Sequence, residues 1–293
     1  MAHPNVRPGS ASPPLGALIQ YWRKARNLSQ LSLANEANVS PRHVSFVETG
    51  RSRPSREMVL RLAETLRVPL RERNALLLAA GFAPVFRESR LDAAELQPVR
   101  AALDAILRQQ EPYPAVVMNR RWDIVATNHG ASTFFDKALG GRSVTSGTQP
   151  NVLRLMFHPQ GLRPSVANWN DVAVGLVQRV HREAVGGVLD DAMRALLAEV
   201  LEYPGVPSTM RLPDLERPLV PVLPVCFRVG EQTFNYFSAV TVLGTPQDVT
   251  LQELRIESFF PSDESTATAA RALADFTHPA TPGMQREIRP AAS

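Results

Sequence analysis

Two valines, Val44 and Val47, stand three residues apart in a stretch that is otherwise polar, basic or aromatic. In a helix this spacing puts both valines on one buried face, so the side chains between them point elsewhere. An arginine there can form two hydrogen bonds with guanine O6 and N7, and an aromatic ring can contact a thymine methyl group. A thin apolar stripe with a polar first turn is typical of a helix that enters a DNA groove. The candidate base-contacting residues are Arg42, His43, Ser45 and Phe46.

Three further polar side chains flank this stretch and have the chemistry to hold phosphate oxygens. Gln30 opens the preceding predicted helix, and its amide can donate a hydrogen bond to a phosphate oxygen. Arg51 and Arg53 follow the stretch, where they would position DNA without reading its sequence. The plainer alternative for Arg42 and His43 is that both are solvated surface side chains.

Capping residues predict the helices that position these side chains. A serine stands before each of two short helical patterns, and Pro41 at a first helical position loses no hydrogen bond. Apolar periodicity predicts three more helices, the last of which ends at Gly81. The five predicted helices begin near Leu15, Ser29, Ser40, Ser55 and Leu70.

The stretch from about Leu15 to Val68 resembles the Cro/C1-type (XRE) helix-turn-helix. The residues that carry the resemblance are Leu33-Ala34, Val39-Ser40, Val44-Ser45, Glu48-Thr49-Gly50-Arg51, Pro54 and Leu62-Ala63. The resemblance implies binding to double-stranded DNA, and it implies that Gln30 holds a phosphate. Pro41 departs from the family, in which a polar side chain often stands there, so one base contact is in doubt. The alternative is a helical bundle with no role in nucleic-acid binding.

The charge of the chain is unevenly distributed. Residues 1–90 hold 14 of the 32 Lys and Arg but only 6 of the 28 Asp and Glu, a balance of +8. The remaining residues therefore carry a balance of −4. A basic segment joined to an acidic one is the pattern expected of a DNA-binding domain attached to a domain with another task.

The second half of the chain predicts an α+β domain. A short hairpin over 115–128 is followed by one or two helical turns at 131–135 and then by helices near 151–157, 167–185 and 190–201. Three long strands over 220–229, 233–243 and 249–260 and a closing helix over 263–276 complete it. We expect a five-stranded antiparallel sheet with helices over one face, in the order of a PAS-like sensor.

Residues 111–270 also resemble the ligand-binding domain of MmyB-like transcription regulators. The resemblance implies a pocket for small apolar ligands such as fatty acids. It rests on Asn128 and on six segments: Asn119-Arg120-Arg121-Trp122-Asp123, Asn151 to Pro159, Gly161 to Pro164, Tyr203 to Val206, Gly244 to Asp248, and Glu253 to Pro261.

Apolar and polar side chains of this domain are candidates for the pocket wall. Asn128 ends the second strand and would orient a ligand, and Arg154 could pair with a carboxylate. The alternative for Arg154 is a structural ion pair with Asp or Glu, and the alternative for the apolar residues is plain core. The candidate ligand-binding residues are Met118, Trp122, Asn128, Arg154, Met156, Phe157 and Phe237.

The predicted organisation has five parts. They are an arm (1–14), the helix-turn-helix domain (15–82), a linker with a connecting helix (83–110), the PAS-like domain (111–276) and a frayed tail (277–293). No apolar stretch is long enough to span a membrane, and no secretion signal is present, so we expect a cytoplasmic protein.

Catalysis, metal binding and cofactor binding have little support in the sequence. Cys226 is the only cysteine, and the six histidines show no metal-ligand spacing. There is no Gly-rich phosphate loop and no G-x-S-x-G elbow. We therefore expect a one-component regulator, not an enzyme, that binds an operator as a homodimer and senses a small apolar ligand. Two alternatives stay open: a ligand-free dimerisation or protein-interaction module at the C-terminus, and an RNA-binding or antitoxin role.

Overall fold

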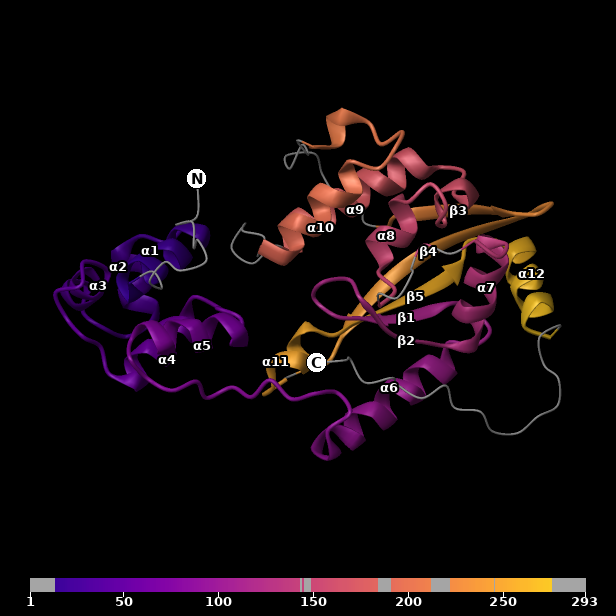
Figure 1. Ribbon diagram of the computed structural model, residues 1–293. Coiled ribbons are helices and arrows are strands. Elements are labelled where there is room, and N and C mark those ends of the chain that lie inside the picture. Colours follow the sequence, from indigo (N-terminus) through magenta and orange to yellow (C-terminus); the bar gives the residue numbers. More distant parts are fainter. Residues whose placement is uncertain are drawn as a thin grey trace. The chain divides into compact units, whose positions relative to one another are not determined.

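A computed structural model of the protein describes residues 14–142, 144, 149–183, 191–211, 222–244 and 246–275. The chain divides into two units, which Figure 1 shows as ribbons. One unit contains the residues through Glu88 together with residues 246–252, and the other contains most of the rest. The predicted tail and all of the predicted arm except Pro14 lie outside the described residues. No described helix is both long and apolar enough to cross a membrane.

The N-terminal unit contains the five predicted helices. They are α1 (Leu15–Ala25), α2 (Gln30–Glu36), α3 (Pro41–Glu48), α4 (Arg56–Thr65) and α5 (Leu70–Ala79). The predicted caps are present, since the Ser29 hydroxyl accepts from the Ser32 amide at 2.9 Å and the Ser40 hydroxyl accepts from the His43 amide at 3.1 Å. Each cap satisfies an amide that the helix itself leaves without a partner, and so fixes where α2 and α3 begin.

Helix α3 packs on the core of this unit through Val44 and Val47, which are 0% and 2% exposed. Their neighbours along α3 are half-buried or exposed, as the spacing of the valines predicts. Helix α1 crosses α3 closely, because a Cβ atom at Gly16 would lie 2.3 Å from the Glu48 carbonyl oxygen. Gly16 therefore permits a helix contact that the sequence analysis did not anticipate.

The second unit is built on a five-stranded sheet in the order β2-β1-β5-β4-β3, and the described pairings are antiparallel, as predicted. The strands are β1 (Ala115–Met118), β2 (Ile124–Thr127), β3 (Pro224–Val229), β4 (Gln232–Val242) and β5 (Arg255–Pro261). Strand β5 is central, with Val116 of β1 opposite Glu257 on one side and Val240 of β4 opposite Glu257 on the other.

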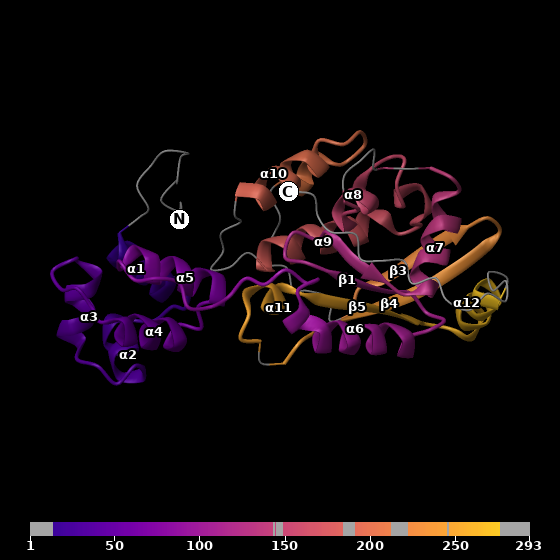
Figure 2. The ribbon, with the colours of Figure 1, turned by 60° about the horizontal axis from the view of Figure 1, so that its bottom comes forward.

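Helices lie on both faces of this sheet. The longer ones are α6 (Gln97–Gln109), α7 (His129–Leu139), α9 (Trp169–Glu183), α10 (Asp191–Leu201) and α12 (Glu264–Asp275), and α8 (Val152–Phe157) is a short one. Short 3-10 turns cover Ala94–Leu96, Arg163–Ser165 and Ser208–Arg211. Figures 1 and 2 show α8, α9 and α10 on one face and α6 on the other. The expectation that helices cover a single face was therefore wrong, because the connecting helix packs on the second face.

Two elements differ from their predicted form. The predicted strand over 249–260 begins as a short helix, α11 (Val249–Glu253), because the Asp248 carboxylate accepts from the Thr250 amide at 2.8 Å and caps it. The predicted turn or two after Asn128 is an 11-residue helix, α7, which ends where Gly140 adopts a left-handed conformation with φ of 56°. A side-chain cap begins the helix in both places, Asp248 for α11 and Asn128 for α7, and at α11 the cap prevails over local β propensity.

Candidate functional site

Helix α3 presents Arg42 and Phe46 side by side. Arg42 is exposed, and its guanidinium lies 5.1 Å from the centre of the Phe46 ring. The two residues are four apart, so they share one face of the helix. The ring holds the guanidinium plane near the helix surface, which reduces the number of rotamers that Arg42 samples before it meets a base.

His43 and Ser45 are less accessible than Arg42. The His43 ring is half-buried, and its Nε2 atom is shielded from solvent with no hydrogen-bond partner among the described residues. Ser45 is also half-buried, and its backbone carbonyl accepts from the Thr49 hydroxyl at 2.8 Å. In this arrangement Arg42 is the best-presented base-contacting candidate, and His43 would have to rotate to reach a base edge.

Gln30 belongs to a buried polar cluster rather than standing free. Its amide nitrogen donates to Glu48 at 2.8 Å, and Arg23 donates to both oxygens of the same carboxylate at 2.6 and 2.9 Å. Arg23 also donates to the Leu28 carbonyl at 2.8 Å. The Glu48 hydrogen bond raises the pKa of Arg23 above its ordinary value. A phosphate can reach Gln30 only through the same amide nitrogen, which carries a second hydrogen atom.

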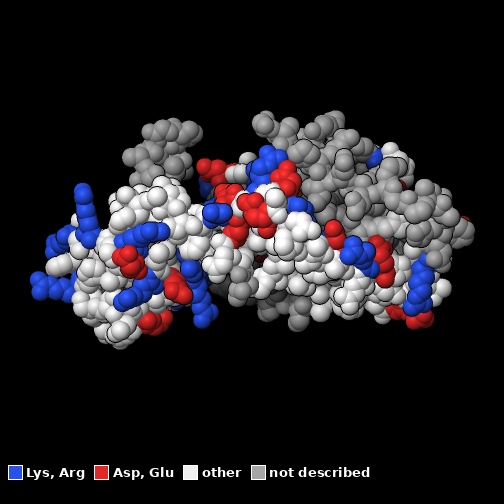
Figure 3. Space-filling model, turned by 90° about the horizontal axis from the view of Figure 1, so that it is seen from below, with Lys and Arg blue, Asp and Glu red and all other residues white. Residues whose placement is uncertain are grey.

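The basic residues after α3 are open to solvent. Arg51 and Arg53 are exposed, and the Arg51 amide donates to the Phe46 carbonyl at 2.8 Å, which closes the turn that follows the helix. Gly50 precedes them with φ of 73°, a conformation that favours glycine. Figure 3 shows Lys and Arg side chains at several places on the visible face of the unit that contains α1 to α5, with Asp and Glu side chains among them. This surface has the charge and the placement needed to contact phosphates.

The second unit contains a cavity of about 660 Å³, within the usual range for small-molecule sites. Its wall is mostly apolar and comes mainly from β1, β3, β4, β5, α8 and α9. Among the predicted ligand-binding residues, Met118, Met156 and Phe237 line it. Sequence analysis missed the contribution of α9, which supplies Asp171, Val174, Gly175, Gln178 and Arg179. The signal available was the spacing of Asp171, Gln178 and Arg179, which recur after seven and eight residues, about two helical turns, among apolar residues of the helix.

Asn128 and Arg154 lie outside the cavity wall, and both have partners within the protein. The Asn128 side chain caps α7 by accepting from the Ala131 amide at 2.9 Å, and it also accepts from the Ala115 amide at 2.9 Å. Arg154 forms two hydrogen bonds of 2.8 Å with the Glu199 carboxylate, which is the structural ion pair that sequence analysis held open. This pairing lowers the pKa of Glu199.

Trp122 and Phe157 are buried core residues that also lie outside the cavity wall. Trp122 is 1% exposed, has φ of 65°, and packs under the Arg179 guanidinium, which lies 4.6 Å from its ring centre. Phe157 is fully buried and meets the Trp169 ring edge-on at 5.8 Å. Trp122 thus packs against Arg179, which lines the cavity, but does not line the cavity itself.

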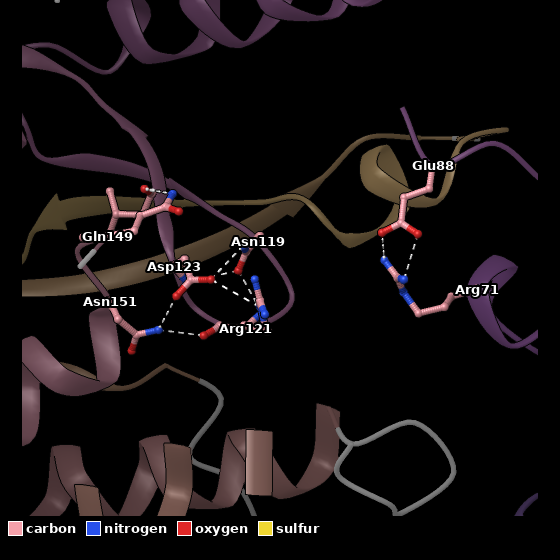
Figure 4. Close-up of polar contacts among 8 residues, drawn as sticks. Arg71, Glu88, Asn119, Arg121, Asp123, Gln149 and Asn151 are labelled. Atoms are coloured by element: carbon pink, nitrogen blue, oxygen red, sulfur yellow. Dashed lines mark hydrogen bonds and ion pairs between the residues drawn. The ribbon is translucent and has the colours of Figure 1, made fainter. Parts of the chain in front are cut away.

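The motif around Asn119 fixes the turn between β1 and β2. The Asn119 side chain accepts from the Asp123 amide at 3.0 Å and donates to the Asp123 carboxylate at 3.0 Å, as Figure 4 shows. Asn151 donates to the same carboxylate at 2.9 Å and to the Arg121 carbonyl at 2.7 Å. These residues hold the start of α8 against the hairpin, so this part of the motif has a structural role.

The cavity has a polar floor at the middle of the sheet. The Glu257 carboxylate accepts from the Arg179 guanidinium at 3.1 Å and from the Ser238 hydroxyl at 2.7 Å. Glu257 is 8% exposed. Charges that are largely withdrawn from water need such partners, since an unpaired buried carboxylate is costly. No group of three or more His, Cys, Asp or Glu residues suited to a metal ion occurs in the part of the chain that the structure describes.

Comparison with known proteins divides the chain as the structure does. Residues 99–273 match the family model of the MmyB-like transcription regulator ligand binding domain. Residues 19–73 match a helix-turn-helix family model. No curated protein matches the chain.

Proposed function

Because this chain belongs to the MmyB-like transcription regulators, which join a DNA-binding helix-turn-helix to a ligand-binding domain, we propose that an apolar ligand in the cavity controls its binding to an operator. The observation that carries the proposal is the cavity of about 660 Å³ with mostly apolar walls. A fatty acid is the first ligand to test. The two matched families are regulatory, which favours a protein without catalytic activity.

Operator binding by a homodimer is part of the proposal. Helix-turn-helix dimers read two half-sites about one helical turn apart, so two copies of α3 would each enter a major groove. The two DNA-binding units of the dimer would exist in more than one arrangement, and a bound ligand would favour the arrangement for which it has the higher affinity. The size of the shift is limited by the difference between the ligand's affinities for these arrangements. A regulator that binds an operator must reach the chromosome, so we propose that the protein is cytoplasmic.

A second candidate is a C-terminal domain that contacts proteins and takes no ligand. The observation in its favour is exposed apolar surface on β4, where Val242 is 58% exposed and Val240, which also lines the cavity, is 43% exposed. Exposed apolar patches often mark interaction sites. The two candidates differ in one measurable property, which is whether the cavity retains a small molecule.

The test is mass spectrometry of small molecules released from the purified full chain by denaturation, followed by operator binding with and without the released compound. The variant Val174→Trp fills the cavity from α9 and serves as the comparison, with Val174→Leu as a size-conservative control. We expect the wild type and Val174→Leu to release a ligand that alters operator affinity, and Val174→Trp to release none. Operator binding that no released or added amphiphile alters would favour the ligand-free module.

A further inference from the structure

Strand β4 is longer than β3, the strand that pairs with its outer side. Strand β3 pairs with β4 only as far as Phe237, which lies opposite Pro224, whereas β5 continues to pair with β4 as far as Val242. Among the described residues, β4 therefore has a neighbouring strand on one side only from Ser238 to Val242. We call this segment the open edge. Its outward backbone N–H and C=O groups can pair with another strand.

The open edge lacks the features by which proteins usually prevent strand pairing. It carries no charge and no proline, and its residues are Ser238, Ala239, Val240, Thr241 and Val242. All of them except Ser238 are exposed. The outer strands of the sheet differ, since β3 begins with Pro224 and exposes Arg228, and β2 has only four residues. Short strands, prolines and charges discourage edge pairing, so the open edge is the part of the described sheet best suited to receive a strand.

Exposed apolar side chains surround the open edge. Of the five large apolar side chains that are exposed on the described residues, three are Val222, Val240 and Val242. Val240 and Val242 are two positions apart in a strand and so share one face of the sheet. Val222 and Val240 both line the cavity, which places them near each other. A strand added here would therefore also remove apolar surface from water, which favours association.

From this geometry we infer that the open edge pairs in antiparallel fashion with the open edge of a second copy of this chain, so that one sheet runs through the dimer. The inference rests on the proposed function, in which two copies bind one operator. A two-fold axis at Thr241 would place Val240 opposite the partner's Val242 and Thr241 opposite the partner's Thr241. Opposed β-branched side chains and opposed threonines stabilise a strand pair, and no like charges meet. A second copy thus covers the exposed surface of β4 without any other protein.

The size of the open edge sets the expected strength of this dimer. A stable protein interface buries about 1,200–2,000 Å² in total, and one short strand edge provides less. We therefore expect weak association of the free protein. Operator DNA should strengthen it, because two copies bound to neighbouring half-sites have a high effective concentration for each other.

Disulfide cross-linking measures the pairing directly. In a two-fold antiparallel pair, the residue on the axis meets its own copy, and a disulfide needs a Cα–Cα distance of about 4.4–6.8 Å. Residues on either side of the axis are offset from their own copies by two positions, roughly 7 Å along the strand, in addition to the spacing between strands. The full chain with Cys226→Ser would carry one new cysteine at a time and be oxidised with and without operator DNA selected from a random pool. The variants are Ala239→Cys, Val240→Cys, Thr241→Cys, Val242→Cys and, as the control, Gln232→Cys.

We expect Thr241→Cys to give the most cross-linked dimer and operator DNA to increase the yield. Gln232→Cys should give little, because Gln232 is an exposed residue of β4 that already lies opposite Val229 of β3. A second measurement uses Val242→Lys, which puts a charge on the open edge at a position outside the cavity wall. Sedimentation equilibrium should show dimer dissociation roughly tenfold or more easier than in the wild type, and Gln232→Lys should behave like the wild type.

The inferred interface is wrong if no cysteine of the open edge cross-links above Gln232→Cys and Val242→Lys dimerises as the wild type does. Ligand release and operator binding would then still support the proposed function. Failure of the proposed function looks different, since the purified chain would release no ligand and select no operator, whatever the cross-linking shows. Should Val242→Lys fold poorly by circular dichroism, the cysteine series decides.

Discussion

The Gln252 side chain accepts a hydrogen bond from the Leu70 amide at 2.7 Å and so caps α5 of the DNA-binding unit. Pro69 precedes α5 and provides no side-chain cap of its own. Gln252 lies in the segment 246–252, which belongs to the N-terminal unit although the chain enters it from β4 and leaves it into β5. The Val249 amide also donates to the Arg87 carbonyl at 2.8 Å within this unit. Both β4 and β5 line the cavity. The segment 246–252 therefore links the strands of the cavity wall covalently to Gln252, the residue that caps α5.

We expect Gln252→Ala to destabilise α5 by about 1 kcal/mol, because the first amide of the helix loses its acceptor. Hydrogen exchange of the first-turn α5 amides measures this directly. The matched control is Gln247→Ala, an exposed residue of the same segment.

The same variant tests whether the cap carries the ligand signal. If it does, Gln252→Ala should keep operator binding but reduce the change in affinity that a ligand causes, whereas Gln247→Ala should respond like the wild type. An unchanged ligand response in Gln252→Ala, together with faster exchange in α5, would restrict the cap to a structural role.

Two arginines of the DNA-binding unit should have separable effects on operator recognition. Arg42 lies on the exposed face of α3, so Arg42→Ala should relax the preference at one base position, at a cost of roughly 1–3 kcal/mol for the preferred base. Arg51 follows the helix, so Arg51→Ala should weaken binding to all sequences alike and lower the salt slope by about one.

Selection from a random DNA pool, with fluorescence anisotropy over a range of salt concentrations, separates these effects. Lys137→Ala removes one exposed charge from the other unit and serves as the control for net charge. An unchanged base preference in Arg42→Ala would assign base reading to another residue of α3.

The sequence was most informative where one residue type determines local geometry. Ser29 and Ser40 cap α2 and α3 as predicted, because a serine before an apolar pattern competes well for the first amides of a helix. The two valines of α3 are buried as their spacing predicts. Short apolar segments likewise predicted the five-stranded antiparallel sheet.

The cavity was less predictable, because its polar residues face each other only after folding. Glu257 and Arg179 are 78 positions apart in the chain, and neither shows by its type that it faces a cavity. Asn128 was a candidate because it ends the second strand, and Arg154 because it could pair with a carboxylate. In the folded chain Asn128 caps α7 and Arg154 pairs with Glu199. The helix at Val249 was missed because β-branched residues obscured the Asp248 cap.

The buried pair of Arg23 and Glu48 ties α1 to the end of α3. The Glu48 side chain is 1% exposed and the Arg23 side chain is 10% exposed. Glu48→Ala would leave the Arg23 guanidinium buried beside the Leu28 carbonyl without its anion, so we expect a loss of about 3–5 kcal/mol in unfolding free energy. Chemical denaturation followed by circular dichroism measures the loss.

The double variant Arg23→Met with Glu48→Leu distinguishes pairing from packing. It removes both charges together and replaces them with apolar groups, so it should recover much of the stability that Glu48→Ala loses. A double variant no more stable than Glu48→Ala would mean that the cluster stabilises the unit mainly through Gln30 and the backbone contacts.

Gly16→Ala tests how closely α1 must approach α3. In a helix exposed to solvent this change would stabilise the protein by about 0.5–1 kcal/mol, because alanine has the higher helix propensity. Here the added Cβ would lie 2.3 Å from the Glu48 carbonyl oxygen and 2.7 Å from the Val47 carbonyl oxygen, which are backbone atoms that cannot rotate away. We therefore expect a destabilisation of about 1–3 kcal/mol, the usual cost of overpacking.

Higher helix propensity would stabilise the Gly16→Ala variant and overpacking would destabilise it, so the sign of the change in stability shows which effect is larger. Thermal unfolding of Gly16→Ala beside the wild type measures it, and operator affinity measures whether α3 has moved. Because α3 is displaced when α1 is pushed outward, operator binding should fall together with stability. A variant that melts higher than the wild type and binds DNA normally would show that the helices can separate without harm.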